Sequence, residues 1–158
     1  MDITFREKEG TFNFRVCGIL IHEGKLLAMH DENSPYYYLP GGRVQLHEPT
    51  EVSVIRELEE ELGIKAKIIR PLWLDQNFFT EVVNGQRYHE ICVYYLIDFT
   101  ESDLLSRGNE FVIHEGHKTL VFEWLEFDRV KSEYLFPLFI KDAIFNIPEH
   151  LTLVTEIH

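Results

Sequence analysis

Hydrophobic and polar positions alternate along much of this chain with the short period of β-strands. Residues 12–22 are apolar on both alternations, which is typical of a strand covered on both faces, and residues 23–25 predict a tight turn. An Asn-Gly pair at residues 84–85 is a strong hairpin signal between two apolar segments. The pattern predicts strands at residues 12–22, 26–30, 67–74, 77–83, 87–99 and 120–127, a loop at 31–35 and a turn at 40–42.

The helical period replaces this alternation between Pro49 and Leu62, a stretch with no internal Gly or Pro. Proline suits the first turn of a helix, where its missing N–H is not needed, and Gly63 suits the position just past the end. We therefore expect a helix of about 13 residues here. Its predicted apolar face has spacings of three and four and consists of Val52, Ile55, Leu58 and Leu62.

A second helix is predicted at residues 134–146. Phe136, Ile140 and Ile144 recur there at helical spacing, and this helix would cover the opposite face of the sheet. Strands interrupted by one helix in the middle and one near the end favour an α/β protein, a three-layer α/β/α sandwich with a mixed β-sheet. No repeat, low-complexity segment or linker divides the sequence, so residues 1–158 are expected to form a single domain.

Composition narrows the class of protein further. The chain has 158 residues, of which 45% are hydrophobic and 27% charged, and this is enough chain to bury a core. We find no leader-like start and no apolar run near the roughly 20 residues that a membrane span needs, so we expect a cytoplasmic protein without a membrane partner. Cys17 and Cys92 lack C-x-x-C spacing, so both are expected as reduced core residues rather than zinc ligands or disulfide partners.

The formal net charge of -12 argues against general binding to nucleic acid, because binding to a phosphate backbone needs clustered Lys and Arg. The same charge opposes an anionic substrate unless metal ions bridge protein carboxylates and substrate phosphates and so reverse the local sign. Acidity is therefore consistent with a metal-dependent enzyme acting on phosphates, without being specific to one.

Residues 42–64 carry the strongest chemical signal. They read GRVQLHEPTEVSVIRELEEELGI and fit the pattern G-x5-E-x7-R-E-U-x-E-E-x-G-U, where U is aliphatic. On the predicted helix Glu57, Glu60 and Glu61 stand at i, i+3 and i+4, so three carboxylates share one face within roughly 5 to 6 Å. Such a face repels itself and suggests a neutralising cation, and oxygen ligands without Cys or His favour Mg²⁺ or Mn²⁺ over zinc. Glu51 and Glu59 are expected on the solvated face instead.

The complete pattern resembles the Nudix box, and the resemblance covers the box fully and the rest of the chain loosely. It implies the Nudix fold and a Mg²⁺-dependent hydrolase that cleaves a nucleoside diphosphate linked to another moiety, by water attack on phosphorus. As the resemblance implies, two or three metal ions would be held by Glu57, Glu60 and Glu61 together with the Gly41 carbonyl.

Arg56 has two interpretations. It lies four residues before Glu60 and can pair with it on the helix. In the Nudix family the arginine at this position is held against the first glutamate of the box, here Glu48, and fixes the loop onto the helix. We expect this orienting role, with direct contact to phosphate as the weaker alternative.

Substrate contacts are predicted before the box and at its start. Gly41 and Gly42 let the backbone approach a ligand closely, and Arg15 and Arg43 are the cations best placed to meet phosphate.

Two aromatic-containing segments add candidates. Glu90 lies on a predicted central strand, where a charged side chain is rarely buried unless paired, so it either lines a cleft or has a structural partner. Its neighbour His89 is a candidate substrate contact or a structural residue. Among the consecutive tyrosines Tyr36, Tyr37 and Tyr38, alternation places at least one in the core, and Tyr38 is a candidate for stacking on a base.

Residues 101–118 are long enough for a functional loop. The Nudix resemblance implies a further glutamate from a late loop that ligates metal or activates water, and Glu115, just before a Trp-containing strand, is the first candidate for this base. Glu110 is the alternative. His114 and His117 lack the H-E-x-x-H pattern and further partners, so a metal site on them is disfavoured.

The substrate is the least determined part of the prediction. A nucleoside triphosphate and a nucleotide sugar such as ADP-ribose both remain open, because fold analogy does not choose between them. The alternative class is a non-catalytic module that binds or senses a nucleotide on the same fold, although the intact set of box glutamates argues against it. A homodimer is left open.

Overall fold

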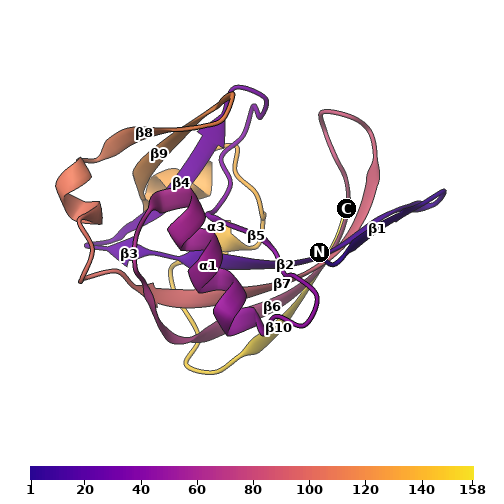
Figure 1. Ribbon diagram of the computed structural model, residues 1–158, viewed down its shortest axis with the longest axis horizontal. Coiled ribbons are helices and arrows are strands. Elements are labelled where there is room, and N and C mark those ends of the chain that lie inside the picture. Colours follow the sequence, from indigo (N-terminus) through magenta and orange to yellow (C-terminus); the bar gives the residue numbers. More distant parts are fainter.

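Two β-sheets form the centre of the molecule, which a computed structural model describes over all of residues 1–158 (Figure 1). The strands are β1 Thr4–Glu7, β2 Gly10–Ile19, β3 Ile21–His22, β4 Lys25–Asp31, β5 Gly41–Arg43, β6 Lys67–Thr80, β7 Arg87–Asp98, β8 Glu110–Glu115, β9 Lys118–Glu126 and β10 Thr152–Ile157. The larger sheet has the order β1-β2-β7-β6-β10, with β5 paired to β2, and the smaller sheet has the order β3-β4-β9-β8.

Parallel and antiparallel pairs both occur in the larger sheet, which confirms the predicted mixed sheet. β2 is parallel to β7 and β10 is parallel to β6, whereas β6 and β7 form a long antiparallel hairpin. The chain leaves the larger sheet after β2 and enters the smaller one at β3, so the strand predicted at residues 12–22 is divided between two sheets. At the predicted turn Glu23 and Gly24 have φ values of 48° and 75°, the left-handed conformation that a tight hairpin requires.

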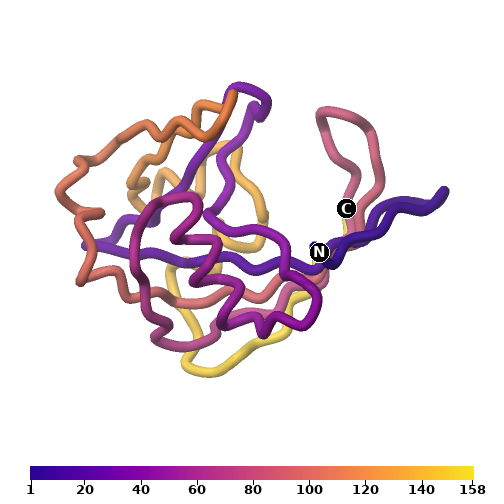
Figure 2. The backbone as a smooth tube through the Cα atoms, in the orientation of Figure 1, coloured from indigo at the N-terminus to yellow at the C-terminus, as the bar shows by residue number.

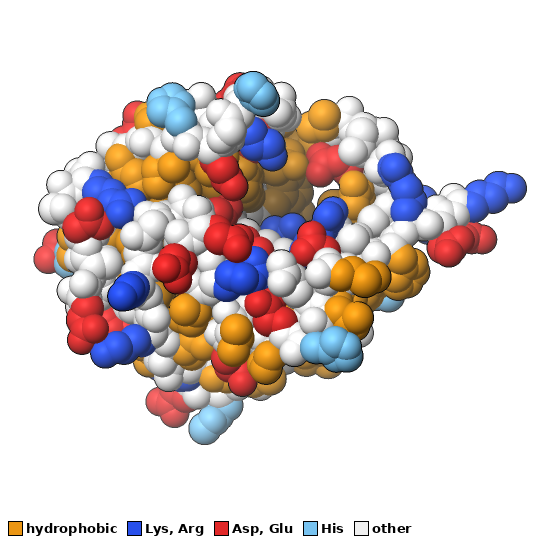
Figure 3. Space-filling view, viewed as in Figure 1, with side chains coloured by type: hydrophobic (Ala, Val, Ile, Leu, Met, Phe, Trp, Pro, Cys, Tyr) orange, Lys and Arg blue, Asp and Glu red, His pale blue; other side chains and the backbone are white.

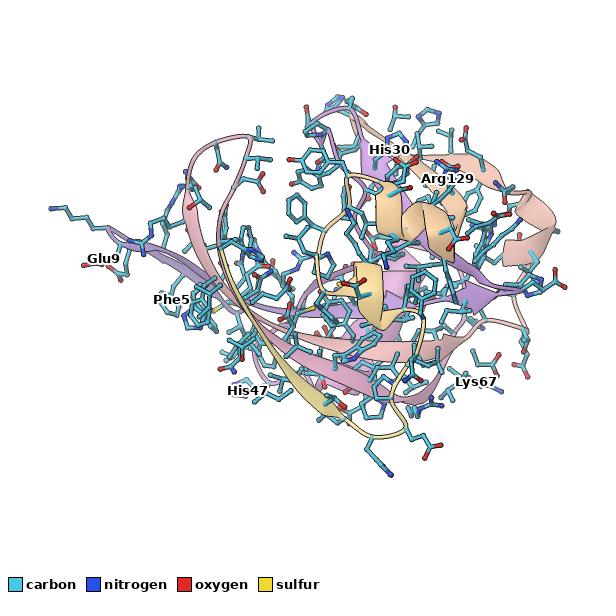
Figure 4. The ribbon with its side chains drawn as sticks, turned by 180° about the vertical axis from the view of Figure 1, so that it is seen from behind. Phe5, Glu9, His30, His47, Lys67 and Arg129 are labelled. Carbon is cyan, nitrogen blue, oxygen red and sulfur yellow. The ribbon has the colours of Figure 1, made fainter.

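Helices cover both sides of the strands. The helices are α1 Thr50–Leu62, α2 Phe127–Ser132 and α3 Ile140–Ala143, with a 3-10 turn η1 Leu104–Arg107. α1 packs into one hydrophobic core, whereas α2 and α3 pack into a second. Figure 1 shows α1 in front of the strands, and Figure 4, seen from behind, shows α2 and α3 on the other side. This arrangement confirms the α/β/α layering. None of these helices is long and apolar enough to cross a membrane.

The helix α1 ends as predicted but turns a different face to the core. Pro49 is its N-terminal cap, and Gly63 follows it with φ 66°. Val54, Leu58 and Leu62, at successive spacings of four, are almost completely buried, whereas Val52 is 54% exposed. The predicted inclusion of Val52 was wrong, because two overlapping apolar stripes fit this sequence and packing selects the one that begins at Val54.

The helix predicted at residues 134–146 is not present as one element. α2 precedes this range, and only the short α3 lies within it. Pro137 has no backbone N–H and cannot continue a helix through this position. Ile140 and Ile144 are nonetheless buried, as their spacing predicted.

Three other predicted boundaries need correction. Residues 101–118 are not one loop, because β8 lies within them and pairs with β9, with Phe111 and Ile113 packing against the core on alternate positions. The strands predicted at 67–74 and 77–83 are the single strand β6, with irregularities near Arg70 and Trp73. Residues 41–43 form β5 rather than a turn, and β1 and β10 were not predicted.

The larger sheet extends beyond α1. Figure 2 shows the β1–β2 and β6–β7 hairpins projecting from the main body, and the tip of the β6–β7 hairpin curves back towards it. Figure 3 shows a hollow between this hairpin and the body, with basic and acidic side chains on its near rim.

Candidate active site

Two glycines bring α1 close to the larger sheet. In β5, Gly41 pairs with Cys17 and Gly42 with Val16. A Cβ added at Gly41 would collide with the Val16 carbonyl oxygen, and one added at Gly42 would collide with the carboxylate of Glu57. Gly41 therefore permits the close pairing of β5 with β2, and Gly42 leaves room for the carboxylate of Glu57 from α1.

Glu57 and Glu61 of α1 both face this glycine strand. The Gly41 N–H donates to Glu61 Oε1 at 2.9 Å. Burial raises the pKa of Glu61 to about 8, although the Gly41 N–H opposes the shift, and the nearby Glu57 raises it further. Burial also raises the pKa of Glu57, against the effect of Arg56. Each of these two carboxylates thus lies where added positive charge would favour its anionic form.

Arg56 joins the helix to the loop before it. Its Nε and Nη2 donate to the two oxygens of Glu48 at 2.7 and 3.0 Å, a bidentate pair. Its Nη1 donates to Glu57 Oε1 at 2.9 Å and to Glu60 Oε2 at 3.2 Å, and its Nη2 also donates to the Arg43 carbonyl at 3.1 Å. The contact with Glu48 that the Nudix resemblance implies is present, while the catalytic consequence of that contact stays a prediction.

The predicted metal ligands are not gathered into one group in this structure. Glu60 has a side chain 55% exposed and pairs with Arg56, and no three His, Cys, Asp or Glu side chains converge closely enough to hold an ion. Glu57 and Glu61 remain as two half-buried oxygen donors beside Gly41 and Gly42. Their chemistry fits a hard divalent cation such as Mg²⁺.

A pocket of about 450 Å³ is lined by Arg15, the cation whose charge acts on both carboxylates, although neither carboxylate lines the pocket itself. Its floor is the face of β2, β7 and β6 that carries Arg15, Glu90 and Asn77, and its walls come from residues 34–39, residues 80–82 and residues 136–138. Arg15 forms no ion pair, and its side chain lies within hydrogen-bonding reach of the Cys17 thiol. Burial alone would lower its pKa, but Glu90 and other neighbours raise it above the ordinary value, so Arg15 stays charged.

Arg15 connects the pocket with the box. It lines the pocket, and its charge lowers the pKa of both Glu57 and Glu61. It is thus a half-buried cation with free donors between an open cavity and two carboxylates.

The other predicted substrate contacts lie on both faces of the larger sheet, and only some of them line the pocket. Tyr38 lines the pocket and donates to Asp31 Oδ2 at 2.6 Å, and Glu90 accepts from Asn13 Nδ2 at 2.7 Å. His89 lies on the opposite face of β7, because side chains alternate along a strand, and stacks on Phe78 at 4.4 Å. Arg43 lies near Asp2 at 3.9 Å and does not line the pocket.

Glu115, the predicted base, lies at the exposed end of β8 rather than in the predicted loop. Lys118 is its cross-strand partner, and Glu115 is not part of any group of carboxylates that could hold a metal ion. The neighbouring histidines His114 and His117 are also exposed, and Glu110 lies at the other end of the same strand. A role for Glu115 as base stays a prediction.

Several pocket residues were missed in the sequence. They are Cys17, Asn77, Phe79, Glu81, Phe136, Pro137 and Leu138. The available signal was the alternation of the predicted strands: with Glu90 on the floor, a correct register places Asn77 directly beside it. Cys17 and Cys92 are free and buried, as predicted.

A helix that carries the box glutamates packs against a mixed sheet, and this combination of fold and site is typical of Nudix proteins. The family model described as "NUDIX domain" matches residues 12–143, and the chain belongs to this family. A protein described as an ADP-ribose pyrophosphatase from Methanocaldococcus jannaschii is 29% identical over 92 residues, which cover 56% of this chain and 52% of that protein. The chain thus spans about half the length of that relative.

Solved structures show the same fold at low identity. The MutT protein from Methanosarcina mazei Go1 has a TM-score of 0.60 at 20% identity, covering 84% of this chain and 90% of that one. An ADP-ribose pyrophosphatase from Streptococcus suis has a TM-score of 0.54 at 16% identity, covering 92% and 98%.

Proposed function

We propose that this protein is a Mg²⁺-dependent pyrophosphohydrolase that cleaves a nucleoside diphosphate linked to another moiety, by water attack on phosphorus. The observation that carries this proposal is the unpaired Arg15 between the pocket and the Glu57–Glu61 pair. A half-buried cation with free donors favours binding of an anion, and the two carboxylates near it favour binding of a cation. A phosphate bound through a divalent metal satisfies both requirements together.

Different residues would bind the metal ion and the phosphate. Glu57 and Glu61 would hold Mg²⁺ beside Gly41, with Glu60 joining them after release from Arg56. When bound, Mg²⁺ supplies positive charge that polarises a phosphate and makes a neighbouring water more acidic. Arg15 would bind and orient the phosphate, and its fixed position means that little rearrangement is needed as charge develops.

Arg56 would act by positioning. It holds Glu57 and the Glu48 loop in one hydrogen-bonded network, so the carboxylate orientation is set before substrate arrives. The aromatic residues that line the pocket, Tyr36, Phe79 and Phe136, would stack on a base.

The relatives support a nucleotide substrate without choosing one. Matching proteins are described as an ADP-ribose pyrophosphatase and as a MutT-like protein from Streptomyces ambofaciens, the latter 39% identical over 54 residues, which cover 34% of this chain and 35% of that protein. A nucleotide sugar and a nucleoside triphosphate are therefore both candidates for this chain.

Product release from a nucleotide panel tests the proposal. ATP, GTP and ADP-ribose are incubated with the protein and Mg²⁺, and phosphate, diphosphate and nucleoside monophosphate are quantified. We expect turnover with Mg²⁺ or Mn²⁺ and none in excess chelator. Full turnover in chelator would contradict the metal requirement, and tight nucleotide binding without any product would favour the sensing module instead.

The base is tested separately by Glu115→Gln, with Glu110→Gln as its matched control on the same strand. If Glu115 removes the proton from water, kcat falls by about 10²- to 10⁴-fold with little change in KM, and the control is much milder. Near-normal rates in both variants would place the base elsewhere.

A further inference from the structure

A row of aromatic and aliphatic side chains crosses the larger sheet on the face opposite to the pocket. Side chains alternate along a strand, and because Glu90 and Asn77 face the pocket, their neighbours His89 and Phe78 face away from it. Directly paired residues of five neighbouring strands continue this row from one edge of the sheet to the other. In sheet order the cross-sheet row consists of Phe5, Phe12, His89, Phe78 and Ile157.

The rings of the cross-sheet row pack on one another. The ring centroids are 5.3 Å apart for Phe5 and Phe12, 5.3 Å for Phe12 and His89, and 4.4 Å for Phe78 and His89. None of the five residues belongs to either hydrophobic core or packs against one. Cross-strand aromatic pairs hold such side chains in defined positions, so the row presents an ordered apolar surface.

The cross-sheet row lies just beyond the part of the sheet that α1 covers. Phe14, two residues after Phe12 on the same face, packs against the core that includes α1. The row itself belongs to the projecting part of the sheet, where Figure 4 labels Phe5. Phe5 is 58% and Ile157 77% exposed. Contiguous exposed apolar surface indicates an interaction site, and aromatic residues are enriched in protein interfaces.

The charges around the cross-sheet row favour a second copy of this chain as the partner. A net charge of -12 makes two copies repel each other in general. On this face, however, the next row outwards carries Glu7 on β1 and Arg87 on β7, one charge of each sign. Neither residue forms an ion pair within the chain. The next row inwards is uncharged and consists of Phe14, Ile91, Gln76 and Thr155.

The size of this face fits a dimer that dissociates. Neighbouring strands lie about 4.8 Å apart and residues on one face about 7 Å apart, so five strands and three rows cover about 24 by 20 Å. Two such faces together bury on the order of 1,000 Å², which is near the lower limit of specific interfaces.

We propose that the cross-sheet row is the centre of a homodimer interface, in which the projecting sheets of two copies pack face to face about a two-fold axis. Such an axis places the same surface on both sides, so Glu7 of one copy can approach Arg87 of the other. The inference does not depend on the proposed function, because the pocket lies on the other face of the sheet.

Sedimentation velocity over a dilution series tests the interface. We expect the parent to show a monomer–dimer equilibrium with a Kd of about 1 to 100 μM, as for a small interface. Phe5→Glu and Ile157→Glu place a charge at the exposed ends of the row and should each raise Kd by about 100-fold or more. Val112→Glu, on the strand β8 and 49% exposed, is the matched control and should leave Kd as in the parent. Circular dichroism checks that every variant is folded.

A second pair of variants tests the charge arrangement. Arg87→Glu gives the face of each copy two acidic residues and should raise Kd by about 10-fold. Combining Glu7→Arg with Arg87→Glu restores one charge of each sign, so Kd should return to within about threefold of the parent value.

Three outcomes would overturn the proposal. One is a parent that stays monomeric up to about 1 mM, the scale of very weak association. Another is a dimer that neither Phe5→Glu nor Ile157→Glu weakens, or that Val112→Glu weakens equally. The third is a monomeric parent that sediments with phosphatidylcholine vesicles unless Phe5→Glu is present, because the row would then bind a lipid surface instead of a second copy.

Discussion

Carboxylates are buried in two parts of this molecule, and their charge is balanced in opposite ways. Around α1, Glu48 receives two hydrogen bonds from Arg56, and Glu57 receives a third. In the parallel pair of β6 and β10, Asp75 is 1% exposed, and neither of its oxygens has a hydrogen-bond partner. Its neighbour Glu156 accepts from the Phe139 N–H at 3.1 Å. The first group is built around the guanidinium of Arg56, whereas Asp75 has no ion-pair partner and Glu156 Oε2 lies 3.5 Å from the imidazole of His158.

The pKa values express this difference. The hydrogen bonds from Arg56 lower the pKa of Glu48 to about 2, although burial opposes them. Burial and the adjacent Glu156 raise the pKa of Asp75 to about 9. At neutral pH the carboxyl group of Glu48 is therefore ionised, whereas that of Asp75 holds a proton. The partners of an acidic residue, rather than its burial alone, decide whether it can serve as a charged ligand.

The largest expected effect follows from removing one charge from the first group. Glu61→Gln should lower kcat by about 10²-fold or more, the scale of losing one preorganised charge-stabilising group. The fold should persist, because the amide oxygen can still accept from the Gly41 N–H. Steady-state kinetics with the best nucleotide of the panel measure kcat, and a circular dichroism spectrum checks that the fold persists.

The control for this change is Glu59→Gln on the exposed face of the same helix. It should behave like the parent. An equal loss in both variants, or none in either, would show that the two faces of α1 do not differ as we infer.

A smaller effect, on stability, is expected from removing the cation. Arg56→Met leaves Glu48 and Glu57, with side chains only 11% and 15% exposed, without their partner. We expect the free energy of unfolding to fall by about 3 kcal/mol at pH 7. The folded pKa of Glu48 lies below its unfolded value, so this contribution is present above about pH 4 and lost as the pH falls through about 2.

Urea unfolding of parent and variant at pH 7 and pH 3 checks this. The difference in the free energy of unfolding between parent and variant should be smaller at pH 3 than at pH 7. Lys67→Met, which removes an exposed pair with Glu101, is the matched control and should change stability by less than about 1 kcal/mol. If Arg56→Met changed the free energy of unfolding as little as Lys67→Met does, solvent rather than Arg56 would stabilise Glu48.

The first acidic group was largely predictable because its determinants are local. Pro49, the glutamate spacing and Gly63 are consecutive signals on one helix, and each acts through neighbours within four residues. Only the choice between Val52 and Val54 on the apolar face depended on tertiary packing, and there the prediction was wrong. The contact of Arg56 with Glu48 came from the family resemblance rather than from spacing.

The second group was not foreseen, for a physical reason. Asp75 and Glu156 meet only because β10 runs parallel to β6, and the register of that pair is set by contacts between segments far apart in the chain. The same limit hid Asn77 beside Glu90 on the pocket floor. Residues 110–115 differ from both cases, because Phe111 and Ile113 alternate with exposed positions and this short period is a local signal for the strand β8.

The smallest expected effect is a gain in stability from replacing Asp75, a carboxyl that the folded protein keeps protonated. The folded pKa of Asp75, about 9, lies above its unfolded value near about 4, so between these limits the unfolded state releases a proton that the folded state keeps. Stability therefore falls as pH rises through this window. Asp75→Asn is neutral at every pH and can donate to Glu156, so it should stabilise the protein by about 1 to 2 kcal/mol at pH 8.

The gain should shrink as the pH is lowered to 5, and urea unfolding at the two pH values measures it. Asp98→Asn gives the contrast, because hydrogen bonds from Thr100 lower the pKa of Asp98, and neutralising that exposed side chain should not stabilise the protein. If Asp75→Asn were destabilising at pH 8, or if its effect did not depend on pH, the carboxyl would be ionised in the folded protein. Asp75 would then require a cationic partner, and the contrast between the two acidic groups would disappear.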